Sequence, residues 1–430
     1  MERTAYQELV NWKNKKNRKP LIVNGARQVG KTWLLKSFGS RNFKNLAYIN
    51  CDESPEIKSA FTDFDTRRLI RIFSSLSGVE ITPEKTLIVL DEIQEAPLAL
   101  TSLKYFCENA PEYHIAVAGS LLGIGLHEGT GFPVGKVDEI NLYPLSFEEF
   151  CNALGKRQLM EQVKNHRWNE LSTLSHAFIE LLRQYYYVGG MPAVVKDYCE
   201  NQNLIAVRQI QNQILADYKR DFSKHVPKVT LPKVNIVWEA IPSQLAKENK
   251  KFIYSAIKKG SRAKDFENAI QWLLDAGLVY KVPRVVKIEK PLKFYEDFDS
   301  FKLFVVDLGL LGAMVQVSPK DVLVNTKAFT EYKGCFTEQY VLQELITLGQ
   351  NAYYYSKENS TLEIDFIIQK DDVYPIEVKA EENLRSKSLK TVYGNNPALK
   401  PCRFSMAGYR KQDWLTNVPL YLAREWIKEI

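Results

Sequence analysis

The chain has 430 residues, of which 45% are hydrophobic and 25% charged, and its formal net charge is +7. These values are ordinary for a globular protein long enough for about three domains. No apolar run approaches the roughly 18 residues of a membrane span, and the first residues lack the apolar core of a secretory signal. We therefore expect a cytoplasmic protein with no membrane partner.

The mild basic excess permits contact with nucleic acid but does not by itself indicate it, because many cytosolic proteins carry a similar charge. The six cysteines are scattered along the chain with no C-x-x-C pair. This spacing predicts reduced cysteines and argues against both disulfides and a zinc site.

The first strong motif is Gly25–Thr32, which fits the phosphate-binding pattern G-x-x-x-x-G-K-[ST]. An apolar run before it predicts a strand, and Trp33–Phe38 after it predicts a helix. Backbone N–H groups and the helix N-terminus would bind phosphate oxygens, Lys31 would reach the β- and γ-phosphates, and Thr32 would hold Mg²⁺. A plain Gly/Lys-rich turn explains the glycines but not the flanking elements. The expected nucleotide-binding residues are Gly25, Ala26, Arg27, Gln28, Val29, Gly30, Lys31 and Thr32.

The first 150 or so residues alternate apolar runs with helix-like stretches, which is typical of a parallel α/β sheet covered by helices. A helix is expected near Ser146, because Ser146 and Glu149 form a capping-box pattern. The expected strands are Leu21–Asn24, Leu46–Asn50, Thr86–Asp91, Tyr113–Ala118 and Val137–Leu142.

The third of these strands ends in the acidic pair Asp91-Glu92. Cleavage of a phosphoanhydride requires one carboxylate to organise the Mg²⁺ shell and another to orient or deprotonate the attacking water. We assign Asp91 to magnesium and Glu92 to the general base. The alternative is that the two acids only solvate the end of a strand.

The fourth strand is followed by Gly119-Ser120. A polar side chain there would lie between the γ-phosphate and the attacking water, which makes Ser120 a candidate sensor and catalytic residue. An ordinary strand-ending turn is an equal alternative.

Residues 151–230 show no strand signal. They contain two long helical patterns, Leu171–Tyr187 and Ile205–Phe222, separated by Gly189–Pro192. Residues 231–290 then predict a helical unit that ends in a strand.

This second region has the order helix, turn, helix and wing, over Phe252–Lys259, Ser261–Ala276 and Leu278–Val282. Ser261 would cap its second helix and Gly277 would end it. Basic residues near its turn would contact DNA phosphates; a spacer or protein-contact module is the alternative. These residues are Lys258, Lys259, Arg262 and Lys264.

From residue 291 onward, strands and helices mix again. The expected strands are Phe301–Asp307, Tyr353–Tyr355, Glu363–Gln369 and Tyr374–Ala380, and the expected helix is Thr337–Leu348.

Asp365, Glu377 and Lys379 lie on two of these strands, and Glu338 lies on the helix. Glu377 and Lys379 are two residues apart on one strand and so share a face. Two carboxylates can bind Mg²⁺, and a lysine can activate water against a phosphodiester. This D-x(n)-E-x-K pattern resembles the PD-(D/E)XK nuclease core, but an ordinary half-exposed strand also alternates in this way. The fold alone does not establish catalysis.

The phosphate loop and the acidic pair, in this order, resemble AAA+ P-loop ATPases. Five segments of the chain are closer still to a prokaryotic AAA+ family whose C-terminal half is a domain of unknown function. These segments are Gly25–Thr32, Leu90–Gln94, Leu142–Phe150, Gly189–Pro192 and Phe301–Leu311. The resemblance implies an AAA+ core, a winged-helix-like unit and a nuclease-like fold.

The chain departs from that family at Gly135-Lys136, where the family usually has Gly-Arg. If that arginine acts as a trans-acting finger, Lys136 gives a point charge instead of a bidentate fork, and hydrolysis would be slow or partner-dependent. A surface lysine is the alternative.

We therefore expect an ATPase domain over residues 1–150, a helical connector over 151–230, a winged-helix-like unit over 231–290 and a nuclease-like domain over 291–430. The leading hypothesis is a Mg²⁺-dependent ATPase that drives the nuclease-like module on DNA or RNA. The main alternative is a scaffold in which ATP occupancy controls a protein partner or self-association. A metabolic P-loop enzyme or nucleotide kinase is disfavoured, because the C-terminal 200 or so residues contain no recognisable small-molecule signature.

Overall fold

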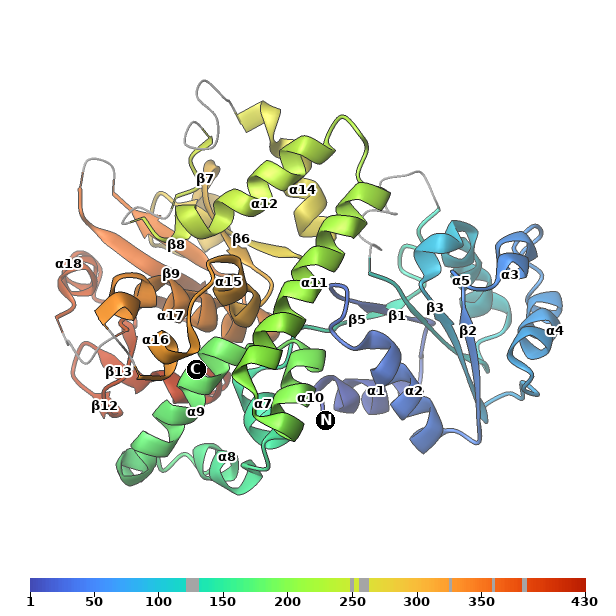
Figure 1. Cartoon of the computed structure of the whole chain (residues 1–430), viewed down its shortest axis with the longest axis horizontal. Coiled ribbons are helices and arrows are strands. Elements are labelled where there is room, and N and C mark those ends of the chain that lie inside the picture. Colours follow the sequence, from blue (N-terminus) through green and yellow to red (C-terminus); the bar gives the residue numbers. More distant parts are fainter. Residues whose placement is uncertain (121–130, 248–250, 255–262, 325–326, 358–359, 381–384) are drawn as a thin grey trace. The chain divides into compact units, whose positions relative to one another are not determined.

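The structure is a computed structural model that describes residues 1–430 except 121–130, 248–250, 255–262, 325–326, 358–359 and 381–384. The chain divides into two compact units, shown in Figure 1. The first contains residues 1–143 and 272–278, and the second contains residues 144–271 and 279–430. Among the described helices, none is both long and apolar enough to cross a membrane.

The first unit is built on a parallel five-stranded sheet with the order β2-β3-β4-β1-β5. All five predicted strands are present, with bounds that differ from the prediction by at most one residue. The strands are β1 (Leu21–Asn24), β2 (Asn45–Asn50), β3 (Thr86–Asp91), β4 (His114–Ala118) and β5 (Asp138–Asn141).

Helices pack on this sheet, and β3 and β4 are buried along their whole length, as expected for parallel strands covered on both faces. Leu69 of α4 and Leu103 of α5 share a hydrophobic core with Ile88 and Leu90 of β3. Helix α2 contacts β2, β3 and β4, and α1 contacts β5 and α2. The helices are α1 (Ala5–Lys13), α2 (Lys31–Asn42), α3 (Pro55–Ala60), α4 (Thr66–Ser77) and α5 (Pro97–Asn109).

The second unit begins with helices, and the first of these helices, α7, has the predicted capping box. The Ser146 side chain accepts a hydrogen bond from the backbone N–H of Glu149, whose carboxylate accepts one from the Ser146 N–H. Further along the chain, residues 168–174 form a 3-10 helix, so the helix predicted to begin at Leu171 begins at Ser175 instead. The helices are α7 (Phe147–Ala153), α8 (Arg157–Lys164), α9 (Ser175–Val188), α10 (Pro192–Asn201), α11 (Leu204–His225) and α12 (Leu231–Leu245).

The predicted helix-turn-helix is described only in part. Ser261, Lys258, Lys259 and Arg262 lie outside the described residues. The described end is α14 (Glu267–Asp275), followed by Gly277 with a φ of +68°, in agreement with the predicted glycine stop.

The strand expected as a wing is β6 (Val279–Val285), and it is part of a large sheet. It pairs with β7 (Glu296–Val305) and also with β8 (Tyr353–Ser356). The described residues give this sheet eight strands in the order β12-β13-β11-β10-β9-β8-β6-β7. The other strands are β9 (Glu363–Gln369), β10 (Val373–Val378), β11 (Cys402–Ser405), β12 (Arg410–Lys411) and β13 (Thr416–Pro419).

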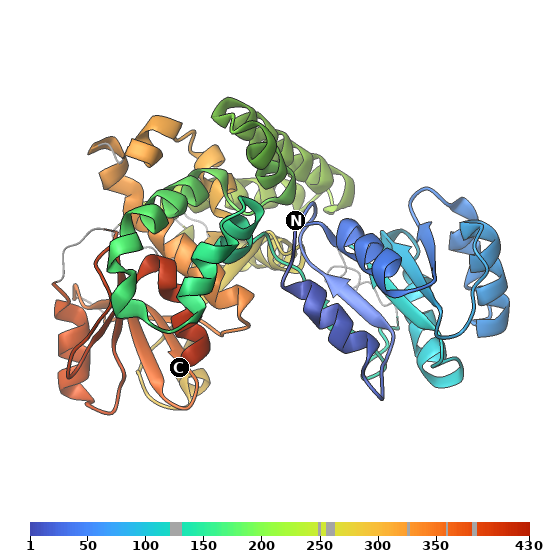
Figure 2. The ribbon, with the colours of Figure 1, turned by 90° about the horizontal axis from the view of Figure 1, so that it is seen from below.

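Helices complete the second unit, and α19 (Ala423–Glu429) packs on β13 and α17, near the end marked C in Figure 2. Helix α18 packs over β9 and β10, where Leu389 and Val392 join a hydrophobic core with Ile367 and Val373. The remaining helices are α15 (Leu308–Met314), α16 (Pro319–Val324), α17 (Lys327–Thr347) and α18 (Lys387–Asn395).

Candidate functional site

The Gly25–Gly30 loop connects β1, between β4 and β5 in the sheet, to the N-terminus of α2. Gly25 has a φ of +145°, and a Cβ atom there would lie 2.2 Å from the backbone oxygen of Leu142. Gly30 has a φ of +96° directly before α2. Only glycine satisfies the close approach at Gly25, and both glycines adopt backbone angles that side chains disfavour.

Lys31 opens α2, and its side chain is turned back into the loop. Its Nζ donates hydrogen bonds of 2.8 Å to the backbone oxygens of Gly25 and Ala26, and the residue is only 7% exposed. Burial lowers the pKa of the Lys31 ammonium to about 8, although Glu92 and Asp91 oppose this effect. The cation is thus held within the glycine loop, close to the acidic pair.

Asp91, at the end of β3, connects three parts of the site. Its Oδ2 accepts hydrogen bonds from the Thr32 hydroxyl at 2.6 Å and from the Tyr48 hydroxyl at 3.0 Å. Its Oδ1 accepts the backbone N–H of Glu92 at 3.0 Å. A hydroxyl and a carboxylate in contact provide the hard oxygen ligands that Mg²⁺ prefers.

Glu92 has a left-handed backbone with a φ of +50°, which is uncommon for a residue with a side chain. The Gln94 side-chain amide donates a 2.6 Å hydrogen bond to Glu92 Oε2. The half-buried carboxylate is therefore held by a neighbour two residues away, next to Asp91.

Ser120 lies two residues beyond β4, the strand between β3 and β1. Because Val117 is level with Leu90 of β3 and Ala118 with Val23 of β1, Ser120 follows the strand at the edge that carries Asp91 and Gly25. Its side chain is buried. The role of Ser120 as a sensor stays a prediction.

Two supporting residues were missed by the sequence analysis. Arg3 is buried and donates to the backbone oxygens of Val29, in the loop, and of Tyr143. Tyr48 bonds Asp91, and burial together with that carboxylate raises the pKa of its phenol. No sequence signal marks Arg3, but Tyr48 lies near the carboxyl end of a strand beside β3, where site residues gather.

Lys136 forms an ion pair with Glu108 of α5, with an Nζ–Oε1 distance of 2.9 Å. Both side chains are well exposed. This contact accords with the surface-lysine alternative.

A glycine loop between a central parallel strand and a helix, with an acidic pair at the end of a neighbouring strand, defines a P-loop ATPase fold. Residues 17–151 match the family model described as an AAA domain. The N-terminal part of the chain is thus an AAA-type ATPase domain, which confirms that part of the resemblance. Comparison with curated proteins gives no match.

Two further family models, both described as domains of unknown function, match residues 179–321 (DUF8612) and 333–421 (DUF4143). The chain is similar at 15% identity to the Walker-type ATPase PABY2304 of Pyrococcus abyssi, over 73% of this chain and 95% of that one, with a TM-score of 0.45. It is similar at 15% identity to the Aeropyrum pernix ORC1 protein in complex with DNA, over 73% and 90%, with a TM-score of 0.25. TM-scores this low establish no shared overall fold.

The nuclease-like residues lie in the second unit. Asp365 of β9 accepts the backbone N–H of Val378 in β10 at 2.7 Å. Glu377 is buried and pairs with Lys379 at 2.9 Å, while its Oε2 is buried without a hydrogen-bond partner within the described residues. The pairing of Phe366 with Ile376 puts Asp365 and Glu377 on adjacent strands at the same level.

Glu338 of α17, which the sequence placed in the nuclease-like group, forms an ion pair with a buried lysine. Its Oε2 lies 3.9 Å from Nζ of Lys302, a fully buried lysine that also pairs with Glu363 at 2.6 Å. Lys302 was missed because a lone lysine in an apolar strand resembles a solvent-facing position. Among the described residues, no group of three or more His, Cys, Asp or Glu side chains is arranged to hold a metal ion.

Arg403 of β11 is level with Glu377 of β10. Burial lowers the pKa of the Arg403 guanidinium, and the Glu377 carboxylate opposes this effect. The guanidinium also donates to Asn417 at 2.8 Å and to Ser386 at 3.0 Å. Among the predicted basic residues of the helix-turn-helix, the described Lys264 is exposed.

Proposed function

We propose that the N-terminal domain binds ATP and hydrolyses it. The observation that carries this proposal is the single connected site in which Lys31 lies in the glycine loop and Thr32 bonds Asp91 at 2.6 Å. Backbone N–H groups of the loop and the N-terminus of α2 would bind the phosphates. The Lys31 ammonium would exchange its carbonyl partners for phosphate oxygens.

The residues present fit a magnesium ion. Thr32 and Asp91 would hold it, Asp91 through water, and the ion would neutralise charge on the β- and γ-phosphates. Tyr48 keeps the Asp91 carboxylate in position.

Glu92 would accept a proton from the attacking water, and Gln94 would hold its carboxylate. The hydrogen bond from Gln94 and the fixed backbone of Glu92 support this role. Ser120 would sense the γ-phosphate from the end of β4.

The experiment is titration of the purified chain with a fluorescent ATP analogue. Lys31→Ala should abolish saturable binding, because it removes the cation that contacts the phosphates. Lys44→Ala, an exposed lysine of the same domain, should bind like the unchanged protein. Equal affinity in all three proteins would disprove the ATP site.

For the C-terminal part we propose a PD-(D/E)XK-like module that acts on DNA or RNA under control of the ATPase domain. Support comes from the order α17, β8, β9, β10, α18, β11, with Asp365 beside Glu377-x-Lys379. The buried Glu377 Oε2, which has no hydrogen-bond partner among the residues that the structure describes, suits a cation ligand. The helical connector, the winged-helix-like unit and the four-part division of the chain remain predictions.

A second candidate is a scaffold whose ATP occupancy changes contacts with a protein partner or a second copy. The Lys379 ion pair and the absence of a three-carboxylate group among the described residues favour it. Nicking of plasmid DNA with Mn²⁺ or Mg²⁺ distinguishes the two. Cleavage that is lost in Asp365→Ala and Lys379→Ala supports the nuclease, whereas equal cleavage in the variants, or none, supports the scaffold.

A further inference from the structure

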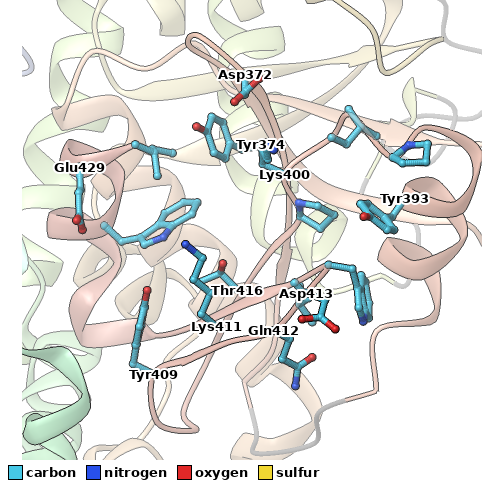
Figure 3. A pocket seen from close by; sticks show the side chains of 17 residues that line it. Asp372, Tyr374, Tyr393, Lys400, Tyr409, Lys411, Gln412, Asp413, Thr416 and Glu429 are labelled. Carbon is cyan, nitrogen blue, oxygen red and sulfur yellow. The ribbon is translucent and has the colours of Figure 1, made fainter.

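A cavity of about 430 Å³ lies at the edge of the C-terminal sheet where β10 and β13 begin (Figure 3). Tyr374 is near the start of β10, and Thr416 opens β13. Of the nuclease-like residues, Glu377 lies at the other end of β10, and Lys379 follows the end of that strand. The cavity is therefore a separate site, and neither the ATPase proposal nor the nuclease-like proposal uses it.

Five aromatic side chains line this cavity. Trp426 of α19 packs edge-on against Tyr374, with ring centroids 5.8 Å apart, and is only 6% exposed, so its ring is fixed. Tyr393 and Trp414 have ring centroids 6.0 Å apart and are both half-buried. The five rings are Tyr374, Tyr393, Tyr409, Trp414 and Trp426.

The polar groups of the wall include both donors and acceptors. Lys411 reaches between Tyr409 and Thr416 toward the middle of the cavity (Figure 3). The carboxylates of Asp413 and Glu429 also line it. Lys411 and Asp413 are exposed, so their side chains can adjust to a ligand.

We infer that this cavity binds a nucleobase. A base has two flat faces that stack on aromatic rings and an edge that carries both donors and acceptors. A bare phosphate would require cations alone, and an ammonium ligand would require acids alone; the mixed lining fits neither. The volume lies within the usual range for a small-ligand site, roughly 300 to 1,000 Å³.

The source of the base is an unpaired nucleotide of single-stranded DNA or RNA, and this choice of source rests on the proposed nucleic-acid role of the module. A free nucleotide offers the same chemistry. A base within a duplex does not, because its faces are stacked and its edge is paired.

The test measures anisotropy of fluorescein-labelled 8-mer single strands, with a blunt duplex and free AMP and GMP as competitors. The protein is the full chain carrying Lys31→Ala, so that the loop site does not bind the nucleotides. EDTA is present, so cleavage does not contribute. Tyr393→Leu and Lys411→Ala should each weaken single-strand binding about tenfold at unchanged melting temperature. Lys228→Ala, an exposed lysine of the same unit that does not line the cavity, should change nothing.

Single strands should also bind more tightly than the duplex. Binding of AMP or GMP with no binding of single strands would support the nucleobase site but overturn its nucleic-acid source. Equal binding by the cavity variants and Lys228→Ala, or no binding of any probe, would overturn the inference. Asp365→Ala distinguishes this site from the nuclease-like one, since it should stop any cleavage while leaving binding in EDTA intact.

Discussion

The Thr32 hydroxyl donates a 2.6 Å hydrogen bond to Asp91, which joins the first turn of α2 to the end of β3. These residues are 59 positions apart in the chain, and only the parallel sheet brings them together. In the proposed function, the cation and the triphosphate would meet the protein at this contact.

Asp91→Asn should weaken ATP binding with Mg²⁺ by about tenfold and leave binding without Mg²⁺ nearly unchanged. The amide keeps the shape and can still bond Tyr48, but it lacks the charge that holds a divalent cation. Titration of the protein with a fluorescent ATP analogue, once in Mg²⁺ and once in EDTA, measures the affinity under each condition. Equal losses under the two conditions would contradict a magnesium role and indicate damage to the loop.

Glu92→Gln should bind ATP normally and lower turnover at least 100-fold, because an amide cannot accept the proton of the attacking water. Phosphate release and analogue binding, measured on the same preparation, separate these effects. Turnover unchanged from the natural protein would remove Glu92 from the role of base.

Gln94→Ala should leave ATP binding intact and lower turnover about tenfold, since it removes the amide that holds Glu92 Oε2. The readout is kcat at saturating ATP. Gln94→Glu is the matched variant: it keeps the length of the side chain but replaces its donor with an acceptor, so it should be at least as slow. Full activity in both variants would show that Glu92 does not depend on Gln94.

ATP affinity should fall as pH rises above about 8. Lys31 has a pKa lowered to about 8 by burial, and the anionic phosphates would raise the pKa in the complex, so binding takes up a proton above that pH. The dissociation constant should increase nearly tenfold between pH 8.5 and 9.5, a range in which ATP itself is fully ionised. Calorimetry in buffers of different ionisation enthalpy should show the proton uptake. An affinity independent of pH over this range would contradict the lowered pKa.

The sequence was sufficient for the ATPase domain, because its signals are local. Apolar runs of four to six residues, a glycine motif and an acidic pair each define a strand end or a turn. The supporting contacts could not be predicted in the same way. Arg3 reaches Val29 across 26 positions, and Tyr48 reaches Asp91 across 43, and neither distance is encoded in a periodic pattern.

In the C-terminal half, the sequence indicated β9 and β10 but not β11, β12 and β13, which are only two to four residues long. The predicted wing strand has the right sequence position, yet its pairing with β8 joins residues that are 70 positions apart. For the same reason the ion pair between Glu338 and the buried Lys302, from a distant strand, could not be predicted, and the convergence of Glu338 with Asp365 stays a prediction.

The first unit should lose stability as the pH falls from about 6.5 to 4. His114 is buried against Trp12 and Phe43, and burial, helped by Arg18, lowers its pKa to about 4. Because the unfolded chain binds a proton near pH 6.5 and the folded one does not, protonation favours unfolding, at a cost of up to about 3 kcal/mol. His114→Phe should reduce this pH dependence, which thermal melts at pH 7, 5.5 and 4.5 measure. A melting temperature that changes with pH as steeply in the variant as in the natural protein would contradict the role of His114.

Gly190→Ala should severely destabilise the second unit. A Cβ atom at Gly190 would lie 2.2 Å from the backbone oxygen of Leu145, and the Gly190 N–H donates a 2.6 Å hydrogen bond to the buried Asp307. The segments that contain Leu145, Gly190 and Asp307 thus meet in the fold, and a methyl group at Gly190 would force the backbone of Leu145 away. Gly334→Ala, in the interior of α17 where the Cβ meets no atom within 4 Å, is the matched control and should be neutral or stabilising by up to about 1 kcal/mol. Thermal melts of both variants measure the difference, and equal melting temperatures would show that the contact at Leu145 relaxes without cost.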